Sequence, residues 1–84
     1  MNRHYSLYLL WSTQGWEVSR ALPAPKEHKP LLSYAYRKYE FPEEKIQVAQ
    51  QRLEEKRSEL EKRHEIPTRH NAQQLFPQLS ELLA

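Results

Sequence analysis

The first quarter of the chain has the hydrophobic pattern of a β-hairpin. Residues 5–11 are mostly aromatic or aliphatic, and residues 16–22 alternate between apolar side chains and polar or small ones. Both runs are typical of strands. The loop between them, residues 12–15, ends in the single glycine of the sequence, and glycine adopts the positive φ that such loops need with the least strain. We therefore predict a hairpin over residues 5–22.

The positions of the two tryptophans predict how these strands pair. If Trp11 lies opposite Trp16, the same register pairs Leu9 with Val18, Leu7 with Arg20 and Tyr5 with Leu22. All of these side chains except Arg20 are apolar or aromatic, and all lie on one face of the hairpin. This is the pattern expected of an antiparallel sheet that buries one face.

Residues 23–41 contain a connector and a segment with two interpretations. Three prolines lie between positions 23 and 30. Proline has no N–H to donate, so we predict an extended connector over residues 23–30. Residues 31–41 fit a strand, with Tyr34 and Tyr36 on one face, but their apolar residues also recur at helical spacing. We favour a third strand here, because an isolated hairpin is only marginally stable.

A long charged helix is predicted over residues 42–66. Pro42 followed by two glutamates is typical of a helix N-terminus, and neither glycine nor proline follows before Pro67. The first half carries an apolar stripe, whereas residues 54–65 are almost all charged apart from Leu60. We expect the first half to pack on the sheet and the second half to extend into solvent or along a partner.

Residues 71–83 are expected to form a short amphipathic C-terminal helix. Asn71 and Gln74 can form a capping box at its start, and Pro77 interrupts its hydrogen bonds. The apolar residues of this segment are Leu75, Phe76, Leu79, Leu82 and Leu83. They either fold back onto the long helix and the sheet or fill a groove on another protein, and we favour fold-back or self-association. Together the elements predict a single α+β domain spanning residues 1–84.

The composition excludes several kinds of site. The sequence has no cysteine and no aspartate, which rules out a disulfide framework, a thiolate metal site, an Asp-based catalytic triad and an EF-hand loop. A single glycine rules out a P-loop and a dinucleotide-binding fingerprint. The histidines have no standard ligand spacing, so we predict no metal site and no cofactor. A chain of 84 residues with 38% hydrophobic residues rarely encloses an acid–base pair, so we predict that it is not an enzyme.

The distribution of charge suggests one function, the binding of nucleic acid. Residues 1–42 carry six Lys or Arg and three Glu, although the whole chain has a net charge of only +2. Residues 26–39 contain both basic residues and tyrosines, namely Lys26, Lys29, Tyr34, Tyr36, Arg37 and Lys38. Aromatic rings stack on bases and basic groups neutralise phosphates. We keep a nucleic-acid-binding surface as the alternative function, because the positive excess is small.

The favoured hypothesis is a small non-enzymatic protein that binds another protein, as a regulator, an inhibitor or an accessory subunit. A thin core, with a mean hydropathy of −0.96, often depends on a partner or on a second copy for stability. The partner would be a larger protein or complex, or the chain itself in a homodimer, and no small-molecule substrate is expected. The predicted contact residues lie on the helix and the tail: Leu53, Leu60, Leu75, Phe76, Leu79, Leu82 and Leu83.

The apolar run at residues 5–11 is too short for the core of a secretory signal and too short to span a bilayer. We therefore predict a cytoplasmic protein without a membrane contact.

Overall fold

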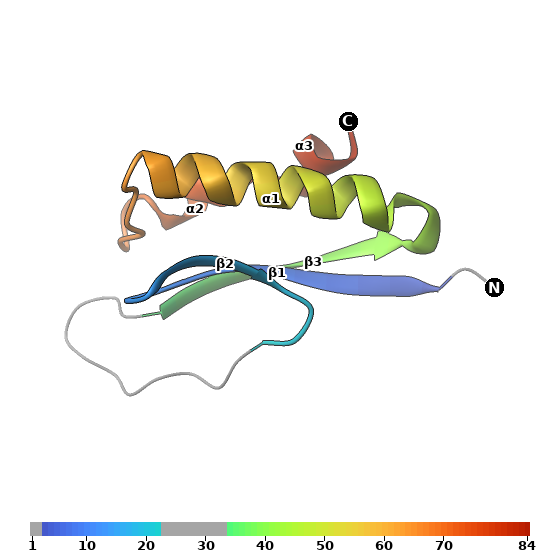
Figure 1. Cartoon of the computed structure of the whole chain (residues 1–84), viewed down its shortest axis with the longest axis horizontal. Helices are drawn as coiled ribbons and strands as arrows, with labels where there is room; N and C mark the ends of the chain where they lie inside the picture. Colours follow the sequence, from blue (N-terminus) through green and yellow to red (C-terminus); the bar gives the residue numbers. More distant parts are fainter. Residues whose placement is uncertain (1–2, 23–33) are drawn as a thin grey trace.

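Three antiparallel strands and one long helix form the two layers of the protein (Figure 1). The computed structural model describes residues 3–22 and 34–84. The strands are β1 (His4–Ser12), β2 (Gly15–Ser19) and β3 (Tyr34–Pro42), in the order β2-β1-β3. The helices are η1 (Glu43–Lys45), α1 (Ile46–Lys62), α2 (Ala72–Leu75) and α3 (Leu79–Leu83), of which η1 is a 3₁₀ turn that leads into α1. This is the predicted α+β fold.

The third strand is confirmed for residues 34–42, where β3 pairs antiparallel with β1 along nine residues. Pro42 is the last residue of this strand and not the first residue of the helix. Residues 23–33 lie outside the described residues, and with them the predicted connector and the first three residues of the predicted third strand.

The hairpin has the predicted register, with Trp11 opposite Trp16 and Leu9 opposite Val18. Gly15 has a φ of 115°, which only glycine adopts without strain. Ser12 pairs with Gly15, so the loop is two residues and not four. A Cβ atom on Gly15 would also lie 2.5 Å from the Glu61 Oε1 atom, so a larger residue here would displace the carboxylate that Trp16 binds.

The outer half of the predicted hairpin does not form. β2 ends at Ser19, so the expected pairs of Leu7 with Arg20 and of Tyr5 with Leu22 are wrong. The Ser19 hydroxyl accepts a hydrogen bond from the Ala21 N–H at 3.2 Å and lies 2.6 Å from the Ala21 carbonyl oxygen. Such side-chain bonds replace ladder bonds and turn the chain away from the sheet. The first half of β1 therefore pairs only with β3.

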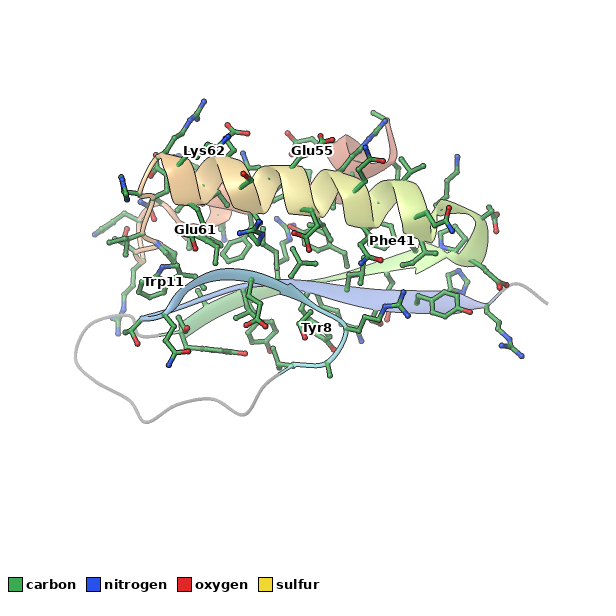
Figure 2. The ribbon with its side chains drawn as sticks, viewed as in Figure 1. Tyr8, Trp11, Phe41, Glu55, Glu61 and Lys62 are labelled. Atoms are coloured by element: carbon green, nitrogen blue, oxygen red, sulfur yellow. The ribbon has the colours of Figure 1, made fainter. Side chains whose placement is uncertain are left out.

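The hydrophobic core lies between one face of the sheet and α1. Alternate residues of each strand point to this face, and Leu9 and Phe41 are fully buried there. The buried residues of the core are Leu7, Leu9, Trp11, Trp16, Tyr39, Phe41, Ala49, Leu53, Leu60, Phe76 and Leu82. Figure 2 shows Phe41 between the strands and the helix, and Tyr8 on the opposite face of the sheet.

The expectation that the second half of the helix leaves the sheet is wrong. Leu60 is only 3% exposed, and the Glu61 carboxylate accepts a hydrogen bond of 2.6 Å from the Trp16 backbone N–H. Other charged residues of the helix, such as Glu55 and Lys62, point away from the sheet (Figure 2). A single row of apolar residues along α1 is enough for this packing. The helix covers one face of a sheet, whereas a helix packed between two other helices would need apolar residues on a wider surface.

The helix ends at Lys62, four residues before the predicted end. Its last turn closes with two backbone hydrogen bonds, from the His64 N–H to the Glu61 carbonyl and from the Glu65 N–H to the Leu60 carbonyl, each 3.1 Å long. This is a Schellman motif, and His64 occupies its left-handed position with a φ of 54°. The end of the helix is therefore set by its cap and not by Pro67.

The tail forms two short helices in place of one, because Pro77 lies between α2 and α3. The predicted capping box at Asn71 is wrong, since the Asn71 Oδ1 atom accepts the Thr68 N–H at 2.6 Å instead. A capping box forms one helix later, between Gln78 and Glu81. The tail folds back onto the core, where Leu82 is buried and the Leu82 carbonyl lies 3.4 Å from the Arg52 Nη1 atom.

The contact between Glu61 and Trp16 is expected to contribute to stability. Glu61→Ala leaves the N–H of a buried residue without a partner, and we expect the free energy of unfolding to fall by about 1–3 kcal/mol. Urea unfolding followed by tryptophan fluorescence measures this. Glu55→Ala, which removes an exposed glutamate of the same helix, is the control and should change it by less than about 0.5 kcal/mol. Equal losses in the two variants would contradict the assignment.

The conformation of His64 gives a second expectation. A residue with a Cβ atom is strained in the left-handed region, so His64→Gly should raise the free energy of unfolding by about 1 kcal/mol. His64→Ala removes the imidazole but keeps the Cβ atom, and it should bring no gain. The same urea titration compares the three proteins, and a gain in the alanine variant would assign the effect to the imidazole.

Candidate functional site

The strand order leaves the main chain of β3 open on one side. β3 lies at the edge of the sheet and is nine residues long, whereas the other edge strand, β2, has five. Across residues 3–22 and 34–84, no hydrogen bond reaches the outer main-chain edge of residues 35–41. An edge of this kind offers alternating N–H and carbonyl groups to another extended chain.

A groove of about 700 Å³ runs beside the first half of β3. Four consecutive strand residues, 34–37, line one side of it. Because successive strand residues point to opposite faces, a space that touches all four lies at the edge of the strand and not on one face. The opposite wall comes from the tail and consists of Thr68, Arg69, Ala72, Gln73, Phe76 and Gln78. We call this space the β3 groove.

Two contacts hold the tail in place as the wall of the groove. The Tyr39 hydroxyl donates a hydrogen bond of 2.7 Å to the Pro77 carbonyl. Phe76 packs edge-on against Trp16, with their ring centroids 5.4 Å apart. Phe76 and Pro77 are both buried, so this part of the wall is as rigid as the core.

Among the described residues that line the β3 groove, the charged ones are both basic. They are Arg37 and Arg69. The Arg37 Nη1 atom lies 3.5 Å from the carbonyls of Phe76 and Pro77, and its guanidinium lies 5.8 Å from the centre of the Tyr39 ring. These partners are neutral. In the described part of the chain neither arginine forms an ion pair, so the groove has a net positive charge.

The open face of the sheet carries a second group of aromatic residues. Tyr36 lies 6.1 Å from Tyr8 and 5.9 Å from Tyr34, measured between ring centroids, and it is 49% exposed. Lys38 forms an ion pair of 3.2 Å with Glu40 on this face, and the hydrogen bond to Glu40 raises the pKa of Lys38. The charges that the strands bring to this face therefore largely cancel.

Two tyrosines of β3, Tyr34 and Tyr39, have raised pKa values. Burial raises the pKa of Tyr34, and the nearby Tyr36 and Glu17 raise it further. Burial also raises the pKa of Tyr39 well above 10, although the Arg37 guanidinium opposes the shift. Both phenols are therefore neutral at physiological pH and can donate hydrogen bonds.

Most residues of the predicted protein-binding set lie inside the fold. Leu53, Leu60, Phe76 and Leu82 are buried in the core, so they are not available on the surface. Leu75 is half-buried and packs against the core. Leu79 and Leu83 are exposed, at 41% and 37%, and a role in binding stays a prediction for these two.

The predicted nucleic-acid set does not form one surface. Tyr34, Tyr36 and Lys38 lie on the open face of the sheet, whereas Arg37 lies on the helix-facing side and contacts the tail. Adjacent residues of a strand point to opposite faces, so Arg37 and Lys38 cannot act together on a single ligand face. Lys26 and Lys29 lie outside the described residues.

Sequence reasoning missed the residues of the tail that face β3, such as Arg69, Gln73 and Gln78. Each is a polar residue in a short segment without periodicity, and no pattern distinguishes it from a solvated position. The apolar pattern of the tail favours fold-back or self-association, and the tail does fold back. The pattern does not indicate that the tail lies against β3.

No protein-family model, curated protein or solved structure matches this chain. Within the described ranges, no three His, Cys, Asp or Glu side chains are grouped so that they could hold a metal ion. In the same residues, no helix is both long enough and apolar enough to cross a membrane.

The buried hydroxyl of Tyr39 predicts a change in stability at high pH. Because its folded pKa is raised above 10, its stabilising effect is complete below about pH 10 and is lost as the pH rises towards the folded pKa. Tyr39→Phe should lower the free energy of unfolding at pH 7 by about 0.5–1.5 kcal/mol, because the bond to Pro77 is lost. It should then lose less stability than the wild type between about pH 10 and pH 12.

Urea titrations across this pH range measure both effects. Tyr36→Phe, which alters a half-exposed ring, should leave the unfolding free energy at pH 7 nearly unchanged. If the wild type and Tyr39→Phe lose stability in parallel above pH 10, Tyr39 is not the responsible group.

Proposed function

We propose that this protein is a small non-enzymatic binding module that holds an extended segment of another protein in the β3 groove. One observation carries the proposal, namely a groove of about 700 Å³ that follows an open edge strand. Its volume lies within the range of roughly 300–1,000 Å³ that is common for binding pockets. An exposed strand edge binds extended peptides through main-chain hydrogen bonds, and adjacent pockets read their side chains.

The chemistry of the groove favours binding over catalysis. General acid–base catalysis needs a titratable group near neutral pH within reach of the substrate. Within residues 3–22 and 34–84, the lining residues include no glutamate or histidine, and the two arginines stay protonated. Backbone groups, amides and aromatic rings form most of the remaining surface, and such groups recognise a ligand without transforming it.

Nucleic-acid binding remains the second candidate, and it has a different location. The aromatic cluster of Tyr8, Tyr34 and Tyr36 on the open face resembles a platform on which single-stranded bases stack. The ion pair of Lys38 with Glu40 and the carboxylate of Glu17 weaken the attraction of this face for phosphates. For this reason the protein-binding proposal is preferred.

We further propose that the protein acts in the cytoplasm, as a regulator, an inhibitor or an accessory subunit of a larger protein. A sequence without cysteine is compatible with a reducing compartment. A short module that binds one extended segment suits each of these roles, because it can cover a site on its partner or attach to it without changing its own fold.

Photo-crosslinking tests where the partner binds. p-Benzoylphenylalanine replaces either Gln73, which lines the groove, or Gln51, which is exposed on α1 outside the groove's lining. Each protein is irradiated in lysate of its native cells, with and without nuclease treatment, and the adducts are identified by mass spectrometry. We expect one protein to crosslink to position 73 and not to position 51.

Three other outcomes would contradict the proposal. Adducts at position 51 alone would move the binding surface to the helix. Equal adducts at both positions would indicate non-specific contact. Adducts that disappear only when nuclease is added would favour nucleic-acid binding.

A further inference from the structure

We infer that the β3 groove takes an acidic peptide segment, which adds to the sheet as a fourth strand and places its carboxylates against Arg37 and Arg69. This inference rests on the proposed function and specifies the chemistry of the partner. Three independent features of the groove support it: its main-chain edge, its charge and the arrangement of its two walls.

On the open face of the sheet, the described residues that protect the edge of β3 lie in its second half. In the second half of β3, Lys38, Glu40 and Pro42 are the kinds of residue that prevent an edge strand from pairing with another chain. The first half has no such protection on its open face, where Tyr34 and Tyr36 are aromatic and favour cross-strand contacts. The groove coincides with this half of the strand, so an added strand would pair with residues 35–37.

The charge of the groove is what selects an acidic segment. Arg37 is half-buried and its partners among the described residues are neutral, and Arg69 is exposed. A guanidinium forms its strongest hydrogen bonds with carboxylates, in a geometry that binds both oxygens. Glutamates of η1, α1 and α3 line two other depressions of the surface, whereas none of the described residues that line this groove is acidic.

The two walls predict a sequence pattern for the partner. The tail wall and Arg37 lie on the helix-facing side of the sheet, whereas Tyr34 and Tyr36 lie on the open side. Side chains of an added strand alternate between these sides. Acidic residues at every second position would therefore meet the arginines, and apolar or aromatic residues between them would contact the tyrosines.

Other occupants fit the groove less well. A second copy of this chain that paired through β3 would bring the same two arginines into the same space, so the contact would be repulsive. Single-stranded nucleic acid would satisfy the arginines, but it has no main chain that matches the alternating groups of a strand edge. Both are outcomes that the experiment can detect.

The first experiment is selection from a random peptide library displayed on phage, against the immobilised full chain. We expect the enriched peptides to carry Asp or Glu at alternate positions. A double variant, Arg37→Glu with Arg69→Glu, should select Lys or Arg at those positions instead. Circular dichroism and a urea titration establish that the variant is folded. If it is not, Arg69→Glu alone, which alters an exposed residue, replaces it.

The second experiment measures one selected peptide as a fluorescent probe. Arg69→Glu should weaken its binding by about tenfold or more, whereas Arg20→Glu, an exposed arginine beyond the other edge strand, should change it by less than about twofold. Amide hydrogen exchange followed by NMR should slow at outward-facing N–H groups within residues 35–37 when the peptide binds. This readout reports strand addition, which charge attraction alone would not produce.

The possible failures can be told apart. Selected peptides that are not acidic but still protect residues 35–37 would overturn this inference and leave the proposed groove in place. Failure to enrich any peptide, or enrichment without protection of β3, would overturn the inference, and the crosslinking at position 73 would then decide the proposed function. A dimer in light scattering that protects the outward-facing N–H groups within residues 35–37 from exchange would replace the acidic segment by a second copy. Tight salt-sensitive binding of a labelled oligonucleotide would replace it by nucleic acid.

Discussion

Trp16 is the residue at which the hairpin, the end of the long helix and the tail meet. Its backbone N–H donates to the Glu61 carboxylate, its indole N–H donates to the Glu65 carbonyl at 2.8 Å, and its ring packs against Phe76. A buried tryptophan needs a partner for each of these polar groups. All of these partners come from residues 61–76. The contacts of this one residue therefore hold together three elements that are distant in the sequence.

This arrangement explains how so small a core supports the β3 groove. A chain of this length buries a limited apolar surface, and residues 63–78 contain few apolar positions of their own. The tail is held by Trp16 and by the bond from Tyr39 to Pro77, and it then stands beside β3 as the second wall of the groove. The residues that maintain the fold thus also determine the shape of the candidate site.

The edge of β3 represents a compromise between exposure and protection. Edge strands that stay fully open tend to pair with unintended chains, and proteins reduce this risk with charges and prolines. In this protein the two halves of the strand differ, and the first half lies beside a groove that Arg37 and Arg69 line. A like-charged second copy is disfavoured there, which would limit self-association while an acidic chain could still enter.

The local elements could be predicted because each depends on short-range chemistry. The alternation of apolar residues, the lone glycine with its positive φ and the helix-forming run after Pro42 each encode an element with little reference to the rest of the chain. The pairing of Trp11 with Trp16 followed from that same local pattern. The third strand needed one further argument, that a hairpin requires another strand to be stable.

The sequence by itself therefore determined the class of fold, the hairpin register near its turn and the presence of one long helix. Only the tertiary structure decided which apolar residues are core, since Leu53, Leu60, Phe76 and Leu82 have the same pattern whether they bind a partner or the sheet. The groove also exists only in the tertiary structure. Arg37 and Arg69 are 32 positions apart in the chain, and packing of the tail beside β3 brings them to one surface. Long-range packing of this kind depends on how closely side chains fit together and on whether buried polar groups find hydrogen-bond partners. The periodicity of a sequence predicts neither.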